Sequence, residues 1–580
     1  MKRLMPYLRP YRRECVLAPL FKMTEAVFEL LVPLVVAVII DRGIPSGDRG
    51  LILRMGGVLV ALGAGGMLLA FTAQWFSAKA ACGFAASVRR ALFSHIQSLD
   101  WTELDAEGTA TLITRLTSDI NQLQSGLNLF LRLFLRSPFV VAGAVVMAFV
   151  VDARTALVFC VTVPLLALVV AAVMRVTTPM YRGVQKRLDG VLAAVRENIT
   201  GARVIRAFGS EDDEQRRFDE QNESLTASQL AVGRISALMN PVTYVIINLA
   251  VIAVLYTGGR RVDAGALSQG EVVALVNYMS QILVELIKFA NLVVSITKAL
   301  ASAGRVESVL ARKAGMAFPE TSAQPDAGAP AVEFDDVSLR YAGAGAPSLE
   351  HVSFTLARGG TLGVIGGTGS GKSSLVNLIP RFYDATSGRV RLEGNDVSAY
   401  TKDTLRAMVA VVPQKAQLFT GTIRSNLQMG APDADDASLW EALRAAQAED
   451  FVRRKPGGLD EPVSAGGKNF SGGQRQRLTI ARALAAKPDI LILDDSASAL
   501  DFATDAALRR ALRELPFAPA VVIVSQRASS LMHADTIVVL DAGSVAGKGT
   551  HEELLKTCPV YEEIYQSQFK TAKERGGEAK

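Results

Sequence analysis

The sequence predicts a multidomain protein in which an all-α transmembrane domain of six long helices precedes an α/β domain of the phosphate-loop class. The chain has 580 residues, which is too long for one hydrophobic core. Long apolar stretches dominate up to about residue 300, whereas the remainder mixes charged residues and Gly as soluble α/β domains do. A glycine-rich segment between a strand pattern and a helix pattern lies near the start of that second part.

Six apolar segments are predicted to cross the membrane. Three contain no charged side chain and are long enough to span the hydrocarbon core, and three are apolar but carry charges. The uncharged segments are residues 55–78, 155–174 and 235–259, and the charged ones are residues 17–40, 127–151 and 272–297. The basic amino end and a phosphate-binding carboxyl half both belong in the cytoplasm, so the number of spans must be even. We therefore expect a multi-pass protein of the cytoplasmic (inner) membrane with both termini cytoplasmic.

Composition argues against several other classes of protein. The formal charge of +6 is modest and forms no basic stripe, so we expect no nucleic-acid partner. The first fifteen residues have neither an apolar core nor a cleavage site, so we expect no cleaved signal peptide. The four cysteines show no metal-ligand spacing and no disulfide framework, which favours isolated reduced thiols.

Composition also predicts the domain boundaries. Two long polar segments, residues 79–124 and 181–234, exceed what a connecting loop needs, so we expect the membrane helices to continue through them into the cytoplasm. A stretch rich in Ala, Pro and Gly without helical or strand periodicity predicts an exposed linker. The expected order is a transmembrane domain (1–313), this linker (314–331), a nucleotide-binding domain (332–570) and a tail (571–580).

The most specific motif lies at residues 361–379, TLGVIGGTGSGKSSLVNLI. It contains G-x-x-x-x-G-K-[ST] between a strand-like and a helix-like segment, which is the context that a phosphate loop requires. Its backbone N–H groups would wrap the phosphates, Lys372 would reach the outer phosphates and Ser373 would bind Mg²⁺. The candidate nucleotide-binding residues of this loop are Gly366, Thr368, Gly369, Ser370, Gly371, Lys372, Ser373 and Ser374.

Two further segments predict chemistry. The run ILILDD (490–495) reads as a buried strand that delivers Asp494 and Asp495 to the carboxyl edge of a parallel sheet. The run SGGQ (471–474) places small residues at the start of a helix, where anions bind readily.

Together with Gln414 of VVPQ, these motifs resemble the nucleotide-binding domain of ABC transporters, and the resemblance covers the whole carboxyl half. Residues 108–124 and 197–218 resemble the two intracellular loops of the family's exporter type. The resemblance implies a half-transporter with six membrane helices and one ATPase domain that works as a dimer. Two ATP molecules would then lie at the dimer interface, each between one subunit's phosphate loop and the other's SGGQ.

The resemblance also implies roles for individual residues. Tyr341 would stack on the adenine, although a structural tyrosine at a strand end is the alternative. Asp494 would hold Mg²⁺ together with Ser373, and Gln414 would sense the metal and the attacking water. The residues expected to clasp the partner's ATP are Ser471, Gly472, Gly473 and Gln474.

The sequence departs from the family pattern at three positions. Asp495 replaces the usual Glu and is shorter by one methylene, about 1.5 Å of reach. Gln526 stands where the switch histidine is expected, and an amide cannot carry a proton as imidazole can. Ala465 replaces a Glu that couples the ATPase to the membrane loops. The candidate catalytic residues are therefore Asp495, Gln526 and Gln414, in a site that we expect to hydrolyse slowly.

An intact phosphate loop and an intact SGGQ beside impaired hydrolytic groups match one subunit of a bacterial heterodimeric, multidrug-type exporter. We expect ATP and Mg²⁺ as cofactors, a second half-transporter as partner, and a small amphipathic, drug-like or lipid-like cargo. Charged and polar residues in the spans either line the cargo cavity or are paired or solvated outside the bilayer, since Lys22 and Lys288 each lie one turn from a glutamate. These candidates include Glu25, Glu29, Gln74, Gln281, Glu285 and Lys288. A homodimeric exporter or lipid flippase with slow ATPase activity, an importer with exporter architecture and an ATP-gated protein that does not pump remain alternatives.

Overall fold

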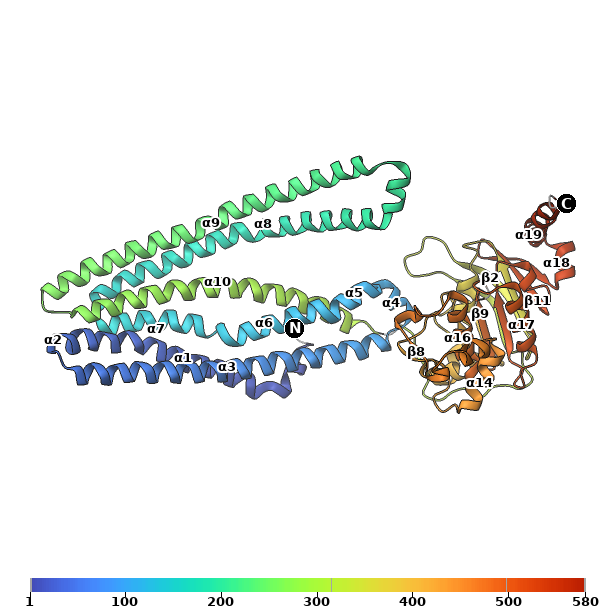
Figure 1. Ribbon diagram of the computed structural model, residues 1–580, viewed down its shortest axis with the longest axis horizontal. Coiled ribbons are helices and arrows are strands. Elements are labelled where there is room, and N and C mark those ends of the chain that lie inside the picture. The colour runs from blue at the N-terminus through green and yellow to red at the C-terminus, as the bar shows by residue number, and fades with distance from the viewer. Residues whose placement is uncertain (1–2, 314, 497, 578–580) are drawn as a thin grey trace. The chain divides into compact units, whose positions relative to one another are not determined.

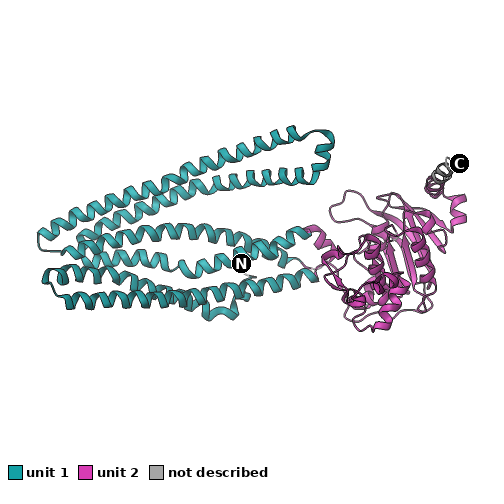
Figure 2. Ribbon diagram, in the orientation of Figure 1, with its two compact units in different colours: residues 1–97, 109–312 teal, residues 98–108, 313–580 magenta. Residues whose placement is uncertain are grey.

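A computed structural model describes residues 3–313, 315–496 and 498–577. The chain forms two compact units (Figure 2). Unit 1 comprises Met1–Gln97 and Thr109–Arg312, and unit 2 comprises Ser98–Gly108 and Lys313–Lys580. A short segment of the amino-terminal half therefore belongs to the same unit as the carboxyl half.

Unit 1 consists of helices, and six of its helical stretches are long and apolar enough to cross a membrane. These stretches are Met5–Ser46, Arg49–Ser98, Thr109–Val151, Ala153–Phe208, Glu211–Asp263 and Gln269–Ala311. Each contains one of the six apolar segments, so the predicted number of spans is confirmed. The elements are η1 (Met5–Tyr11), α1 (Arg12–Val38), η2 (Ile39–Gly43), α2 (Ile44–Ser46), α3 (Arg49–Ser98), α5 (Thr109–Thr114), η3 (Arg115–Asp119), α6 (Ile120–Leu133), α7 (Arg136–Val151), α8 (Ala153–Phe208), α9 (Glu211–Asp263) and α10 (Gln269–Ala311).

Polar side chains at the ends of these helices satisfy backbone groups that would otherwise lack partners. The Asp152 carboxylate accepts a hydrogen bond from the Thr155 backbone N–H at 2.9 Å and so caps α8. Ser268 and Glu271 form a capping box at the start of α10. Asp41 accepts hydrogen bonds there from the Ser268 hydroxyl and from the Gly270 N–H at 2.6 Å. These contacts tie the end of the first span to the start of the sixth.

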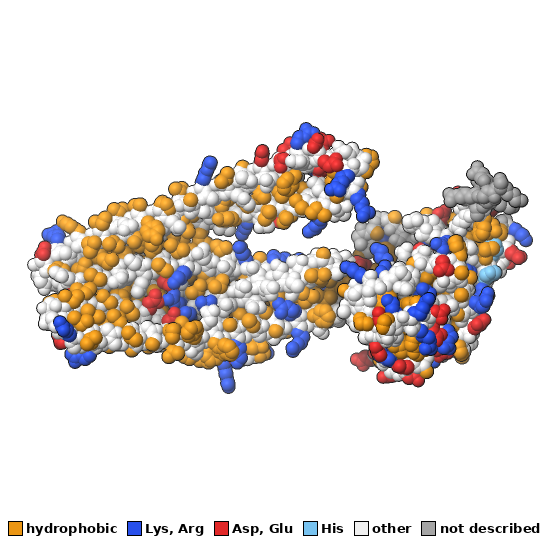
Figure 3. Space-filling view, in the orientation of Figure 1, with side chains coloured by type: hydrophobic (Ala, Val, Ile, Leu, Met, Phe, Trp, Pro, Cys, Tyr) orange, Lys and Arg blue, Asp and Glu red, His pale blue; other side chains and the backbone are white. Residues whose placement is uncertain are grey.

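Apolar side chains of α1, α7, α8, α9 and α10 form the main core of unit 1. Hydrophobic side chains also cover much of its surface, whereas the surface of unit 2 mixes charged and apolar groups (Figure 3). Helices α8 and α9 lie side by side and diverge from the other helices of unit 1 toward the turn that joins them (Figure 1). Since α8 and α9 meet near residues 209–210, the polar segment 181–234 continues two membrane helices, as its length predicted.

Unit 2 is built around three β-sheets. The sheet orders are β2-β1-β4-β5, β12-β11-β3-β10-β9-β6 and β7-β8. In the six-stranded sheet all neighbouring pairs are parallel except β11 and β12. The strands are β1 (Val332–Leu339), β2 (Leu349–Leu356), β3 (Thr361–Gly366), β4 (Ser387–Leu392), β5 (Asn395–Asp396), β6 (Val409–Val412), β7 (Gly421–Thr422), β8 (Pro462–Val463), β9 (Ile490–Asp494), β10 (Ala520–Val524), β11 (Thr536–Asp541) and β12 (Ser544–Gly549).

Helices complete unit 2 and enclose two apolar cores, which share the strands of the six-stranded sheet. Strands β3, β9 and β10 contribute side chains to both cores, which is why they read as nearly continuous apolar runs. The helices are α4 (Trp101–Glu107), α11 (Lys372–Leu378), η4 (Val397–Ala399), α12 (Lys402–Met408), α13 (Ile423–Leu427), α14 (Asp436–Ala445), α15 (Glu449–Arg453), η5 (Gly458–Asp460), η6 (Ala465–Gly467), α16 (Gly472–Ala485), α17 (Phe502–Arg513), η7 (Ala528–Ser530), α18 (His551–Thr557) and α19 (Pro559–Gly577).

The structure also describes the segments expected as a linker and as a tail. The segment expected as an exposed linker has no helix or strand, but it lies against unit 2 because Phe318 packs on the core and the Ala323 N–H donates to the Ala399 carbonyl. Its first residue, Ala314, lies outside the described residues. The expected tail is helical as far as Gly577, the end of α19, while residues 578–580 lie outside the described part.

Candidate nucleotide site and membrane charge cluster

The candidate catalytic groups gather at the carboxyl edge of the six-stranded sheet. The phosphate loop follows β3, Gln414 follows β6, Asp494 and Asp495 end β9, and Gln526 follows β10. Because these four strands are parallel neighbours, their carboxyl ends lie at one edge, where ligands of open α/β sheets bind. Parallel pairing therefore brings together residues that are more than a hundred positions apart in the sequence.

Glycines give the phosphate loop its shape. Gly369 and Gly371 have φ angles of 83° and 97°, a left-handed region that side chains disfavour. A Cβ on Gly366 would lie 2.1 Å from the Leu540 carbonyl oxygen, so the loop fits against β11 only with Gly at this position. The Lys372 ammonium donates to the carbonyl oxygens of Gly366 and Gly367 at 2.9 and 2.6 Å. Burial lowers the pKa of Lys372.

The residues expected to hold Mg²⁺ lie together. Ser373, at the start of α11, donates a hydrogen bond from its hydroxyl to the Asp494 carboxylate at 3.4 Å. Burial raises the pKa of Asp494, against the effect of this hydrogen bond. A hydroxyl and a carboxylate at the mouth of a phosphate loop are the oxygen donors that Mg²⁺ prefers, so these residues fit the ion. ATP fits the same loop, because its glycines free backbone N–H groups for phosphate oxygens.

Asp495 has a left-handed backbone conformation. Its φ is 45°, and its N–H donates to the Val524 carbonyl at 3.0 Å, which holds it against the end of β10. Asp tolerates this left-handed region better than most residues do. The Gln414 amide donates to the Asp495 carboxylate at 3.2 Å. The structure thus brings together two of the three candidate catalytic side chains.

Gln526, the third candidate, has an exposed side chain in the loop that follows β10. A segment that sequence reasoning missed holds this loop in place. Gln568, on the carboxyl-terminal helix α19, donates to the Gln526 carbonyl at 2.7 Å and accepts from the Ala528 N–H at 2.9 Å. No sequence motif marks Gln568, because the contact depends on how α19 packs.

The SGGQ segment begins helix α16. Ser471 and Gln474 form a capping box, so their side chains satisfy the first turn of the helix. A Cβ on Gly472 would meet nothing within 4 Å among the described residues. No contact within the described part of the chain therefore requires Gly at position 472, which suits a surface that must admit a bulky group from outside.

Tyr341 lies beside the phosphate loop, as its predicted role requires. Its hydroxyl donates to the Ser374 hydroxyl at 3.1 Å, and its ring meets the edge of Tyr383 with 5.0 Å between centroids. Tyr383 in turn donates to the Asp105 carboxylate at 2.6 Å. Asp105 belongs to α4, the short helix from the amino-terminal half, so α4 is linked to the phosphate loop through two tyrosines.

Helix α4 is held in unit 2 by further contacts. The Trp101 ring packs on Phe382 with 5.3 Å between centroids, and the Asp100 carboxylate accepts from the Met316 N–H at 2.6 Å. Trp101 and Phe382 lie far apart in the sequence, so local sequence patterns could not predict their contact. The length of the polar segment 79–124 was the one available signal that this region reaches the ATPase domain.

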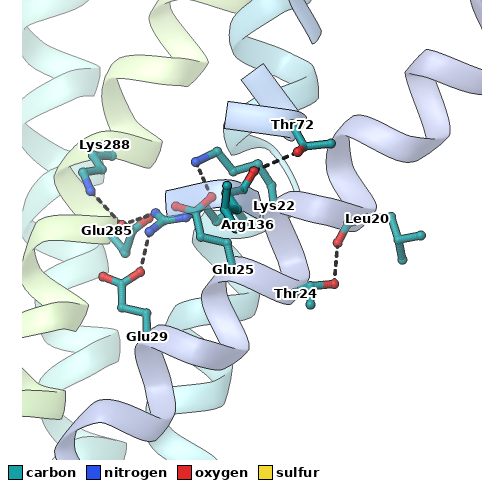
Figure 4. Close-up of polar contacts among 10 residues, drawn as sticks. Leu20, Lys22, Thr24, Glu25, Glu29, Thr72, Arg136, Glu285 and Lys288 are labelled. Carbon is teal, nitrogen blue, oxygen red and sulfur yellow. Dashed lines mark hydrogen bonds and ion pairs between the residues drawn. The ribbon is translucent and has the colours of Figure 1, made fainter. Parts of the chain in front are cut away.

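A second group of functional candidates lies within the spans of unit 1, where acidic and basic side chains interrupt a hydrophobic surface (Figure 3). The two lysine–glutamate pairs expected one turn apart both form: Lys22 with Glu25 at 2.5 Å, and Lys288 with Glu285 at 2.9 Å. Arg136 of α7 reaches Glu29 of α1 at 2.6 Å and Glu285 of α10 at 2.5 Å (Figure 4). No local sequence pattern predicts that Arg136 connects these two carboxylates.

The charges of this cluster differ in exposure. The side chains of Arg136 and Glu285 are 8% and 3% exposed, whereas that of Glu29 is 39% exposed. Ser137 donates to the second oxygen of Glu285 at 2.8 Å, so both oxygens of that carboxylate have a partner. Glu285 is therefore a bound structural charge, and Glu29 is the carboxylate of the Arg136 pair that is open to its surroundings.

Comparisons with known proteins now identify the family. Residues 15–286 match the family model of the ABC transporter transmembrane region, and residues 349–498 match the ABC transporter family model. An ABC transporter ATP-binding protein of Mycobacterium tuberculosis is 36% identical over 570 residues, which cover 98% of each chain. The chain belongs to the ABC transporter family.

Other ABC transporters extend the comparison. An ABC transporter ATP-binding protein of Bacillus subtilis is 35% identical over 573 residues, 98% of this chain and 99% of that one. A fatty acid ABC transporter ATP-binding/permease protein of Mycobacterium bovis is 33% identical over 470 residues, 80% of this chain and 73% of that one. The solved structure of a bacterial Atm1-family ABC exporter with ATP bound covers 96% of this chain with a TM-score of 0.79 at 23% identity, which shows the exporter fold.

Proposed function

We propose that this ABC transporter is one half of a heterodimeric exporter. It binds ATP at a site with impaired hydrolysis, and it contributes a complete SGGQ segment to a hydrolytic site on an unlike subunit. Family membership and fold support an ATP-driven membrane transporter of the exporter type. The proposed part is that one subunit binds ATP without hydrolysing it rapidly while the other subunit carries the hydrolytic site.

The observation that carries the proposal is the side chain of Asp495. A general base must lie within hydrogen-bond distance of the water that it serves, and a misplacement of about 1 Å can lower the rate about a hundredfold. Asp495 is about 1.5 Å shorter than Glu, and its carboxylate already accepts a hydrogen bond from Gln414. Gln526 stands in place of a second hydrolytic group. Its amide can donate to a phosphate oxygen but cannot exchange a proton as imidazole can.

The other residues of the site support ATP binding. Lys372 carries the positive charge for the outer phosphates, Tyr341 offers a ring face to the adenine, and the loop N–H groups wrap the phosphates. Ser373 and Asp494 would hold Mg²⁺, with Gln414 beside them. The ion held by these residues would neutralise phosphate charge. A site with these groups holds ATP while lacking a well-placed base.

The SGGQ segment of this chain supports a hydrolytic site shared with a partner. The amino end of α16 presents N–H groups to an anion, and Gly472 leaves room for it. In the proposed dimer, Ser471 to Gln474 complete the ATP site whose Glu and His come from the other subunit. The termini and both ATP sites then lie in the cytoplasm, with the spans in the cytoplasmic membrane.

Purification of this chain alone and with a co-encoded half-transporter tests the proposal. We expect the chain alone to bind ATP but to release phosphate slowly, and the pair to turn over briskly. Measured ATP binding by the chain alone shows that it is folded, which separates an impaired site from a denatured one. Fast hydrolysis by this chain paired with itself would contradict the proposal.

We also propose an amphipathic, lipid-like or drug-like cargo. An open apolar groove of about 510 Å³ lies beside the charge cluster, and Ser137, which contacts Glu285, is its polar lining residue. Its lining residues are Ser137, Pro138, Val141, Ala142, Val145, Val146, Val163, Leu286 and Phe289. One relative is named a fatty acid ABC transporter, which favours the same class of cargo. ATP-driven uptake of a fluorescent single-chain amphiphile into inside-out vesicles would distinguish a pump from an ATP-gated protein.

A further inference from the structure

The carboxyl-terminal helix α19 contacts the loop that carries Gln526, and a single side chain makes that contact. Gln568 donates to the Gln526 carbonyl at 2.7 Å and accepts from the Ala528 N–H at 2.9 Å. One amide therefore binds two backbone groups that flank Arg527. A planar amide that fills both its donor and its acceptor role fixes the position and the direction of the loop.

Other contacts also restrain this loop. The Arg527 N–H donates to the Ser525 hydroxyl at 3.0 Å, the Arg527 guanidinium donates to the Ser498 carbonyl at 3.5 Å, and the buried Ala528 lies next to it in the chain. Gln526 itself has an exposed side chain. Gln568 adds a direct contact with the Gln526 backbone, from which that exposed side chain extends.

Helix α19 is in turn anchored to the core of unit 2. Tyr561 is fully buried, and its hydroxyl lies 2.7 Å from the His551 ring nitrogen Nδ1. Ile564 and Tyr565 pack against the same core. Since the amino-terminal part of the helix is fixed, Gln568 is presented to the loop from a rigid support.

We propose that Gln568 is a positioning residue for the nucleotide site: it holds the Gln526 loop in the conformation that contacts the γ-phosphate. This inference rests on the proposed role of Gln526 in retaining ATP. It makes α19 part of the ATP site although α19 carries none of the family motifs. A displacement of α19 would release the loop and shorten the time for which ATP stays bound.

The test is Gln568→Ala in the full-length chain, with Gln566→Ala as the matched control. Gln566 lies on the same helix, and its amide donates to Glu562 of its own helix. Hydrogen exchange of the Ala528 amide in nucleotide-free protein reports the contact directly. We expect Gln568→Ala to speed that exchange roughly threefold to tenfold, as the loss of one hydrogen bond implies, while Gln566→Ala leaves it unchanged.

The second readout is the dissociation rate of radiolabelled ATP from this chain's site with Mg²⁺ present. We expect Gln568→Ala to accelerate release severalfold with the thermal midpoint within about two degrees of the parent. Gln568→Glu keeps an acceptor for the Ala528 N–H but loses the donor to Gln526, so it should preserve amide protection and still accelerate release. Unchanged exchange at Ala528 would overturn the proposed contact. Faster exchange with unchanged ATP release would overturn the positioning role.

The positioning proposal and the heterodimer proposal can fail independently of each other. Fast hydrolysis by the chain alone would refute the heterodimer proposal, whereas the Ala528 exchange is measured without nucleotide or partner. If Gln568→Ala and Gln566→Ala behave alike in both measurements, α19 has no role in the ATP site.

Discussion

At the scale of single residues, the proposed slow hydrolysis depends on the length of the Asp495 side chain. Its backbone is held at β10 through the Val524 carbonyl, so the carboxylate cannot advance by a shift of the chain. An added methylene would extend its reach by about 1.5 Å.

We therefore expect Asp495→Glu to raise phosphate release by this chain about tenfold to a hundredfold, because a carboxylate of the longer reach can contact the attacking water. Asp495→Asn is the control and should leave the slow parent rate nearly unchanged. A large drop in Asp495→Asn would show instead that the short carboxylate already acts as the base.

Residue motifs predicted which groups lie at the carboxyl edge of the sheet, while their roles stay predictions. Gly366, Lys372 and Asp494 meet because parallel strands end at one edge of the sheet. Continuous apolar runs in the sequence indicate such strands. Gln568 and Tyr383 could not be predicted, since each acts through a contact between segments that no local pattern links. The two partners of Arg136 on α1 and α10 follow from helix packing alone.

At the scale of secondary-structure elements, Arg136 connects three helices of unit 1 through a buried ion pair with Glu285 and a half-exposed pair with Glu29. Removal of one partner from a buried pair costs up to about 3–5 kcal/mol when the remaining charge has no other partner. We expect Arg136→Met to lower the free energy of unfolding by less than this amount, because Lys288 and Ser137 still contact Glu285, and thermal denaturation in detergent measures the loss. Glu29→Gln should cost much less, because the Glu29 side chain is 39% exposed.

The double variant Arg136→Met with Glu285→Gln is the control for that prediction. It removes both buried charges, and we expect it to recover much of the lost stability. Equal destabilisation by the single and the double variant would indicate that packing, and not the unpaired charge, causes the loss.

A second element-scale prediction concerns α4. Tyr383 donates to the Asp105 carboxylate at 2.6 Å, and a hydrogen bond to a charged group contributes about 1.5–3 kcal/mol. Tyr383→Phe should therefore weaken the docking of α4, seen as faster hydrogen exchange over Trp101–Glu107, and reduce stimulation of ATP hydrolysis by cargo. ATP affinity should remain unchanged, because Tyr341 keeps its contact with Ser374.

At the scale of the whole molecule, each ATP site of the proposed dimer draws on both subunits. A change in this chain's SGGQ then affects hydrolysis at the partner's phosphate loop, and a change in this chain's phosphate loop affects the slow site.

We expect Ser471→Asp in the heterodimer to lower ATP turnover about a hundredfold, because a carboxylate repels the γ-phosphate although Asp caps α16 as well as Ser does. Lys372→Ala should abolish ATP binding at this chain's own site and lower turnover far less. Steady-state phosphate release by the purified pair measures both variants. Equal loss of turnover in the two would contradict the assignment of hydrolysis to the partner's site.

The sequence alone determined the family resemblance, the number of spans and the groups at the sheet edge. These depend on local patterns: apolar length decides whether a helix can cross a bilayer, and a phosphate loop is contiguous in the chain. The tertiary structure alone decided that α4 belongs to the ATPase unit, that Arg136 pairs with two helices, and that Gln568 holds the Gln526 loop. These contacts join residues dozens to hundreds of positions apart, and side-chain packing, not local periodicity, determines which of them meet.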